Sequence, residues 1–290
     1  MASFYNEISK NKIESYSLML IVFFIILGMG YLLSYFFDSI IIAVIAGVFA
    51  IIYTLIGYYW SDKIVLKISG AIEADEKKDA HLINVVEGLA IAAGLPKPKV
   101  YIINDKAPNA FATGRDPPHS SIAVTSGLLE IMNREELEGV ISHELSHIKN
   151  YDIKFMTLVA VMVGMISIIA NISLRSFLWG GSGDRENKNP YLLIIGIAFI
   201  VLSPIFANLV RLAVSRKREF LADATGAMLS RYPEGLASAL EKLEHVDTNV
   251  KTATDATAHL FIAAPVKKRF LTLFATHPPL EERVRRLREM

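Results

Sequence analysis

Two long apolar stretches open the chain. Residues from Tyr16 to Phe37 and from Ser39 to Trp60 are uncharged and mostly apolar, and only Asp38 separates them. Each stretch is long enough to cross the hydrocarbon core of a bilayer as a helix. The pattern therefore predicts a transmembrane hairpin. The first stretch lacks a strongly basic leading segment and is followed at once by the second, which argues against a signal peptide.

A second pair of apolar stretches lies in the middle of the chain. Phe155 to Leu174 and Tyr191 to Val210 are bounded by charge and joined by a polar, glycine-rich linker at residues 180–188. We expect a second transmembrane hairpin. The alternative is a pair of helices buried in a soluble core, because several Ser, Asn and Gly residues dilute the apolar character. The expected division of the chain is 1–60 (hairpin), 61–154 (first part of a folded domain), 155–210 (second hairpin) and 211–290 (second part of that domain).

Charge gives the orientation of these segments. With two or with four spans, residues 61–154 and 211–290 lie on the same side as the N-terminus. Lys and Arg residues gather near the spans on that side: Lys10, Lys12, Lys63, Lys67, Lys149, Lys154, Arg211, Arg216, Lys217 and Arg218. The opposite side offers only Arg175, Arg185 and Lys188. The excess of basic residues predicts that the folded domain faces the cytoplasm of a multi-pass protein in the cell membrane.

The residues outside the apolar stretches predict an α+β fold, mostly helical with a small sheet. Short β-prone runs occupy 99–103, 109–113 and 121–125. Helical patterns run from about Asp79 to Ala93, where Gly94 and Pro96 end the helix, and over 234–246 and 280–289. Another helix should start at Asn133, with Glu136 at the capping-box position. The Thr-rich segment 247–258 reads as a loop.

Composition supports the membrane assignment. The chain is 52% hydrophobic and has a mean hydropathy of +0.39, more than a soluble domain of this size usually carries. Cysteine is absent, so disulfides and a cysteine nucleophile are excluded. The net charge of +1 and the lack of a basic-aromatic patch give no indication of nucleic-acid binding.

The candidate chemistry centres on His143, Glu144 and His147, which form a HExxH pattern within the helix that starts at Asn133. Residues four apart share a helix face, so both imidazoles can bind one Zn²⁺, and Glu144 is left to polarise the attacking water. The alternative is a chance pair of structural histidines. The amphipathic helix around the motif favours the metal site and a peptidase in which Glu144 is the general base.

A catalytic zinc usually has three protein ligands, so a third must come from elsewhere. Glu219 and Asp223 are spaced i, i+4 on another helix, shortly after the last apolar stretch. Glu219 would be the ligand, and Asp223 would accept a hydrogen bond from a ligand histidine. The alternative pairs Glu219 with a neighbouring basic residue. A zinc-stabilised membrane scaffold without proteolytic activity is the alternative function, but a structural site would need a fourth ligand.

Four motifs in order make the chain resemble the HtpX family of integral-membrane zinc metallopeptidases, which is distantly similar to the CAAX prenyl endopeptidases. The motifs are Asn109-Ala-Phe-Ala112, the HExxH helix, Ser215-Arg-Lys-Arg-Glu-Phe-Leu-Ala-Asp223 and Thr276-His-Pro-Pro-Leu-Glu-Glu-Arg283. The resemblance implies a zincin-like (gluzincin) domain with one Zn²⁺ per chain, bound by His143, His147 and Glu219. It also implies Glu144 as general base, with Asp223 supporting the ligands.

The resemblance further implies that Asn109, Ala110, Phe111 and Ala112 form an exposed edge strand that pairs with the substrate backbone. It directs attention to His277 and Arg283 as stabilisers of the oxyanion; the alternative is a loop histidine and a surface arginine. The expected substrates are membrane proteins with cytosolic segments, and the resemblance implies that damaged ones are among them, in quality control and stress response. The flexible segments 180–188 and 247–258 are candidate sites of self-cleavage.

Overall fold

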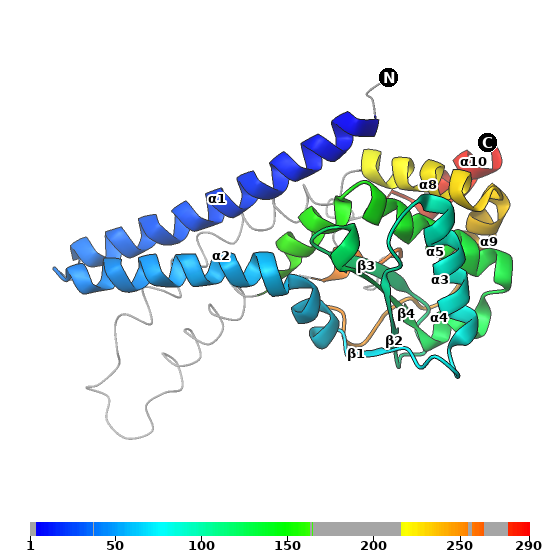
Figure 1. Ribbon diagram of the computed structural model, residues 1–290, viewed down its shortest axis with the longest axis horizontal. Coiled ribbons are helices and arrows are strands. Elements are labelled where there is room, and N and C mark those ends of the chain that lie inside the picture. The colour runs from blue at the N-terminus through cyan, green and yellow to red at the C-terminus, as the bar shows by residue number, and fades with distance from the viewer. Residues whose placement is uncertain (1–3, 37, 163, 165–215, 255–256, 264–277) are drawn as a thin grey trace.

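The computed structural model describes residues 4–36, 38–162, 164, 216–254, 257–263 and 278–290 (Figure 1). Most of the expected second hairpin, the linker at 180–188 and His277 lie outside the described residues. The described start of the third apolar stretch, residues 155–162, is helical. Phe155, Leu158, Val159 and Met162 are buried in a cluster with Leu18, Val22 and Tyr53 of the first two helices.

The N-terminal hairpin consists of two long helices, α1 (Phe4–Phe36) and α2 (Ile40–Ile68). They lie side by side and project from the rest of the molecule (Figure 1). Both are long and apolar enough to cross a membrane, and only 22% and 17% of their most apolar windows are buried. This exposure distinguishes them from the core helices of a soluble protein. α2 continues past the predicted end of the span, and its last turns bury Val65 and Leu66 against the sheet.

The sheet has four strands, β1 (Ala71–Glu73), β2 (Lys99–Ile103), β3 (Ala110–Gly114) and β4 (Ser120–Thr125), in the order β1-β2-β4-β3. β2 and β4 run parallel, whereas β1 pairs with β2 and β3 pairs with β4 antiparallel. Three of the strands match the β-prone runs of the sequence. β1 was not predicted, since three residues are too few to show a pattern.

β3 lies at the edge of the sheet, as expected, but it is not exposed. Asn109, Ala110 and Phe111 are completely buried, and Ala112 is 4% exposed. The expectation of an exposed strand was wrong because other parts of the chain cover it. The ring of Phe111 packs edge-on against Phe261, with 5.1 Å between the ring centroids. The N–H of Ile262 donates a 2.9 Å hydrogen bond to the carbonyl of Ala110.

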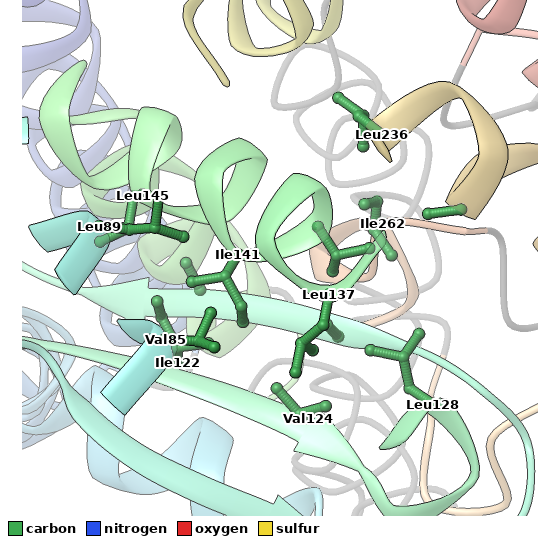
Figure 2. Packing of buried hydrophobic residues seen from close by; sticks show 14 of the residues in the cluster. Val85, Leu89, Ile122, Val124, Leu128, Leu137, Ile141, Leu145, Leu236 and Ile262 are labelled. Carbon is green, nitrogen blue, oxygen red and sulfur yellow. The ribbon is translucent and has the colours of Figure 1, made fainter. Parts of the chain in front are cut away.

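The main core lies between the sheet and helices α3 (Ala80–Ala93), α5 (Arg134–Lys149) and α9 (Pro233–His245). Figure 2 shows side chains of α3, β4 and α5 meeting in this layer, among them Val85, Ile122 and Ile141. α3 ends as predicted at Gly94, which adopts the left-handed conformation with φ of 67°. This φ favours glycine, which has no Cβ.

The C-terminal part of the domain adds helices α8 (Arg216–Ser230) and α10 (Leu280–Arg288) beside α9. Short elements complete the fold: α4 (Ser126–Ile131), η1 (Pro117–His119) and η2 (Ala258–Leu260). The predicted helices over 234–246 and 280–289 are confirmed to within one residue at each end. The result is the predicted α+β fold, mostly helical with a small mixed sheet.

Candidate active site

Helix α5 carries the HExxH residues. Its first turn is fixed by a capping box in which Asn133 Oδ1 accepts from the N–H of Glu136, while the Glu136 carboxylate accepts from the N–H of Asn133. The helical spacing then places His143 and His147 on one face. Both rings are almost completely buried, 1% and 5% exposed. The structure therefore confirms the helix that the sequence predicted around the motif.

Helix α8 places Glu219 opposite the two histidines. The Nε2 atoms of His143 and His147 are 3.1 Å apart. The carboxylate oxygens of Glu219 lie 3.9 Å from the first Nε2 atom and 3.7 Å from the second. Tetrahedral zinc bound at about 2.0–2.2 Å separates its ligand atoms by roughly 3.3–3.6 Å. The observed separations are close to this range, and two imidazoles, which bind metal in their neutral form, with one carboxylate form a ligand set that suits a catalytic zinc.

Asp223 follows Glu219 by one turn of α8 and reaches the first ligand histidine. Its Oδ1 lies 3.0 Å from His143 Nδ1. A proton on Nδ1 leaves Nε2 with its lone pair directed at the metal position. Burial alone would raise the pKa of Asp223, but the charge of Arg283 and the hydrogen bonds to His143 and Arg283 together outweigh burial and lower the pKa. Asp223 is therefore charged and acts as an acceptor.

His147 has its own carboxylate partner, Asp152, which was not among the predicted site residues. Asp152 Oδ2 lies 3.0 Å from His147 Nδ1. α5 ends at Lys149, Tyr151 adopts a φ of 60°, and the chain becomes helical again from residue 152. This break turns Asp152 back toward the ligand. An acidic residue directly after the end of a HExxH helix was the only signal in the sequence.

Arg283 of α10 completes the wall of the site. It is completely buried, so the alternative of a surface arginine was wrong. Its guanidinium donates two hydrogen bonds to Asp223, from Nε at 2.9 Å and from Nη2 at 2.7 Å. Nη1 donates to the carbonyl of Ile262 at 3.2 Å and lies 3.6 Å from Glu219. His277 lies outside the described residues.

Burial and neighbouring charges shift the protonation of the three HExxH side chains. Burial lowers the pKa of His143 to about 4. Burial would also lower the pKa of His147, but without a bound metal the hydrogen bond to Asp152 and the charge of Glu219 raise it to about 9, so metal binding there releases a proton. Burial raises the pKa of Glu144 to about 7. A carboxyl group with a pKa near neutrality can both accept and return a proton.

Strand β3 contacts the site through its backbone. The N–H of Ala112 donates a hydrogen bond to the Glu144 carboxylate, which favours the charged form of this group. The side chain of Asn109 binds a nearby loop instead, since its Nδ2 donates to the carbonyl of Ala263 at 2.9 Å. The structure thus brings β3 next to Glu144.

These features define a class of protein, the zincin-like metallopeptidases, here combined with an apolar helical hairpin. The chain belongs to Peptidase family M48, whose model matches residues 76–290. Membership of this family identifies the chain as a metalloprotease. The three converging ligand residues agree with this activity.

Similarity to individual proteins extends over the whole chain. The Protease HtpX homolog of Caldanaerobacter subterraneus subsp. tengcongensis is 47% identical over 291 residues, covering 98% of this chain and 97% of the relative. The Protease HtpX homolog of Dictyoglomus turgidum is 46% identical and covers 99% and 95%. The resemblance to the HtpX branch, inferred from four short motifs, is confirmed.

A solved structure shares the fold. The crystal structure of S. mikatae Ste24p superposes with a TM-score of 0.52 at 20% sequence identity. The match covers 96% of this chain and 65% of that chain. At this identity the likeness concerns the fold alone, and it confirms the zincin-like α+β architecture joined to apolar helices.

Proposed function

We propose that the protein is a membrane-embedded zinc endopeptidase in which His143, His147 and Glu219 hold the metal. The observation that carries this proposal is the convergence of three buried ligand atoms from two helices, with Glu144 on the same helix as the two histidines. When bound there, zinc supplies Lewis acidity toward a substrate carbonyl and toward water.

Glu144 moves the proton in this proposal. It accepts a proton from the attacking water and returns it to the leaving amine, which a pKa of about 7 permits at neutral pH. The N–H of Ala112 orients its carboxylate. Asp223 and Asp152 hold the tautomers of the two ligand histidines through Nδ1.

For Arg283, the contacts favour a positioning role. Its N–H groups are directed at Asp223, Ile262 and Glu219. In this arrangement Arg283 stabilises the buried charge of Asp223 and thereby orients His143. In this proposal His277 stabilises the oxyanion, because it belongs to the family motif at Thr276–Arg283.

The proposed substrates are membrane proteins cleaved on the cytosolic side, including damaged or misfolded ones. The hairpin holds the domain beside the bilayer, and the basic residues near the spans favour a cytoplasmic domain. Substrate backbone would pair with residues 109–112 of the edge strand. The N–H of Ile262 already donates a hydrogen bond to the carbonyl of Ala110. Substrate pairing at Ala110 therefore requires residues 260–263 to move away from the strand.

A direct test compares the wild-type protein with Glu144→Gln, both purified in detergent, treated with chelator and then given Zn²⁺. Casein cleavage and self-cleavage are followed together. Glu138→Gln is the matched control, because Glu138 lies on the same helix and is 30% exposed. Zinc-dependent cleavage by the wild type and by Glu138→Gln, with none by Glu144→Gln, is the expected result. Equal cleavage by all three would indicate a contaminating protease.

A zinc-stabilised scaffold without activity is the competing function. A structural zinc site closes four positions with protein ligands. Among the described residues, the cluster of ligand atoms contains only His143, His147 and Glu219. Zinc binding without proteolysis by the wild type would favour the scaffold.

A further inference from the structure

The N-terminal helix reaches the metal ligands through one buried side chain. Asn11 lies in α1, five residues before the start of the first predicted span at Tyr16, and is only 2% exposed. Its Nδ2 donates to Asp152 Oδ1 at 2.6 Å and to the carbonyl of Asn150 at 2.9 Å. The amide of Asn11 therefore holds the segment that follows α5.

Asp152 connects this amide to a ligand histidine. One carboxylate oxygen accepts from Asn11, while the other lies 3.0 Å from His147 Nδ1. A carboxylate that accepts from the Nδ1–H of a ligand histidine fixes both the tautomer and the orientation of the ring. The hydrogen bond from Asn11 prevents the carboxylate from rotating away from His147.

The helix with the third ligand joins the same network. Arg218, directly before Glu219 in α8, donates from Nε to Asn11 Oδ1 at 3.1 Å. It also forms an ion pair with Glu14 of α1 and lies 3.6 Å from Asp152. Asn11 thus uses both ends of its amide, one toward the segment that follows α5 and one toward α8. Buried polar networks whose members are all satisfied fix side-chain positions.

We propose that Asn11 is a positioning residue for the metal ligand His147 and acts through Asp152. The N-terminal membrane helix is then a structural part of the metal site as well as an anchor. The inference rests on the proposed zinc site. The competing role for Asn11 is that of an anchor for α1, which would affect stability and leave zinc affinity unchanged.

A double-mutant cycle on the full chain in detergent separates these roles. The variants are Asn11→Leu, which has similar size and no donors, Asp152→Asn and the combination of both. Zinc affinity is measured by competition with a chelator of known Kd, and Tm of the chelator-treated protein reports stability separately. Lys10→Gln is the matched control, because Lys10 lies on the same turn of α1 and is 58% exposed.

Loss of a carboxylate behind a ligand histidine weakens metal binding by about 10–100-fold. We expect such a loss for Asp152→Asn and a smaller one for Asn11→Leu, about 3–10-fold, because its effect is indirect. The double variant should bind zinc no more weakly than Asp152→Asn alone. Lys10→Gln should keep the wild-type affinity. Should Asn11→Leu not fold, Asn11→Asp provides the test, since it keeps the shape and places a second carboxylate against Asp152.

Two results would overturn the inference. A lower Tm for Asn11→Leu with zinc affinity within about twofold of the wild type would make Asn11 a simple anchor. Additive losses in the double variant would show that Asn11 does not act through Asp152. A wild-type protein that binds no zinc would overturn the proposed function together with this inference. Zinc binding by the wild type therefore distinguishes a failure of the inference alone from a failure of both.

Discussion

Arg283 and Asp223, 60 residues apart in the chain, form a two-point ion pair beside the metal ligands. Both side chains are buried. The pair connects the last helix of the chain, α10, to α8, and Asp223 in turn binds His143. Removal of one partner of a buried ion pair strongly destabilises the folded protein, because the other charge stays buried and unpaired. The pair therefore links the stability of the C-terminal part to the geometry of the site.

Replacement of Arg283 should destabilise the protein and weaken zinc binding together. We expect Arg283→Met to cost about 3–5 kcal/mol, because Asp223 would remain buried and charged without its partner. Arg283→Lys should restore only part of this loss, since an ammonium cannot donate two parallel hydrogen bonds. Tm and zinc affinity are measured with Arg285→Met as control, an arginine of the same helix that is 62% exposed. Equal Tm values for the Met variants at 283 and 285 would contradict the expected role.

Close packing at Gly226 should be required for the site. Gly226 lies on the same face of α8 as Glu219 and Asp223, and a Cβ there would lie 3.0 Å from the backbone N of His143. Gly226→Ala should push α8 away from α5 at a cost of about 1–3 kcal/mol and weaken zinc binding.

Gly88→Ala is the control for this substitution. Gly88 is exposed in α3, and an added Cβ would meet no atom within 4 Å. This change should raise stability by about 0.5–1 kcal/mol, because glycine is a poor helix former. Thermal denaturation of both variants tests the pair of expectations. If Gly226→Ala were as stable as Gly88→Ala, α5 and α8 could move apart without loss of stability.

The capping box of α5 should make stability depend on pH. Glu136 accepts hydrogen bonds from Asn133, Ser238 and Lys242. Burial alone would raise its pKa, but these partners outweigh burial and lower it from the ordinary value of 4.5. The folded protein thus binds this proton more weakly than the unfolded chain. The contribution to stability is fully present above about pH 4.5 and is lost as the pH falls through the lowered pKa.

Glu136→Gln tests this dependence. At pH 7 the substitution should cost about 1–3 kcal/mol, the usual range for hydrogen bonds to a charged group. The difference in Tm between the wild type and Glu136→Gln should shrink as the pH falls below about 4.5. Glu138→Gln, whose partner Arg134 is exposed, should change Tm little at any pH. A Tm difference for Glu136→Gln that stays constant down to pH 3 would argue against the lowered pKa.

The absence of native cysteine allows a clean test of orientation. Asp38 lies in the turn between α1 and α2, whereas Lys77 is exposed in the folded domain. We expect Asp38→Cys to react with an impermeant thiol reagent added to intact cells. Lys77→Cys should react only after the membrane is permeabilised. The reverse pattern of labelling would place the domain on the outer side.

The residues that bind the proposed metal could be predicted from sequence because helical periodicity determines them locally. His143 and His147 share one helix face, and Glu219 and Asp223 share another. The need of a catalytic zinc for a third ligand then directed attention to the acidic pair on the second helix. Such local patterns need no knowledge of long-range packing.

Contacts between distant parts of the chain were not accessible in the same way. Asn11 and Asp152 are 141 residues apart, and no periodicity connects them. The burial of β3 depends on Phe261 and Ile262, which the pattern of the strand itself does not show. Arg283 is an intermediate case. Leu280, Val284 and Leu287 mark one face of α10, and an arginine on that face was a readable sign of a buried charge.

The zinc content of the purified protein shows whether His143, His147 and Glu219 hold the metal. After equilibration with Zn²⁺ and removal of the excess, wild type and Glu144→Gln should each retain about one zinc ion per chain. Glu219→Ala should retain almost none while remaining folded by circular dichroism, and Glu138→Gln should match the wild type. Full zinc occupancy in Glu219→Ala would contradict the proposed metal site, since the third ligand would then have to come from another residue.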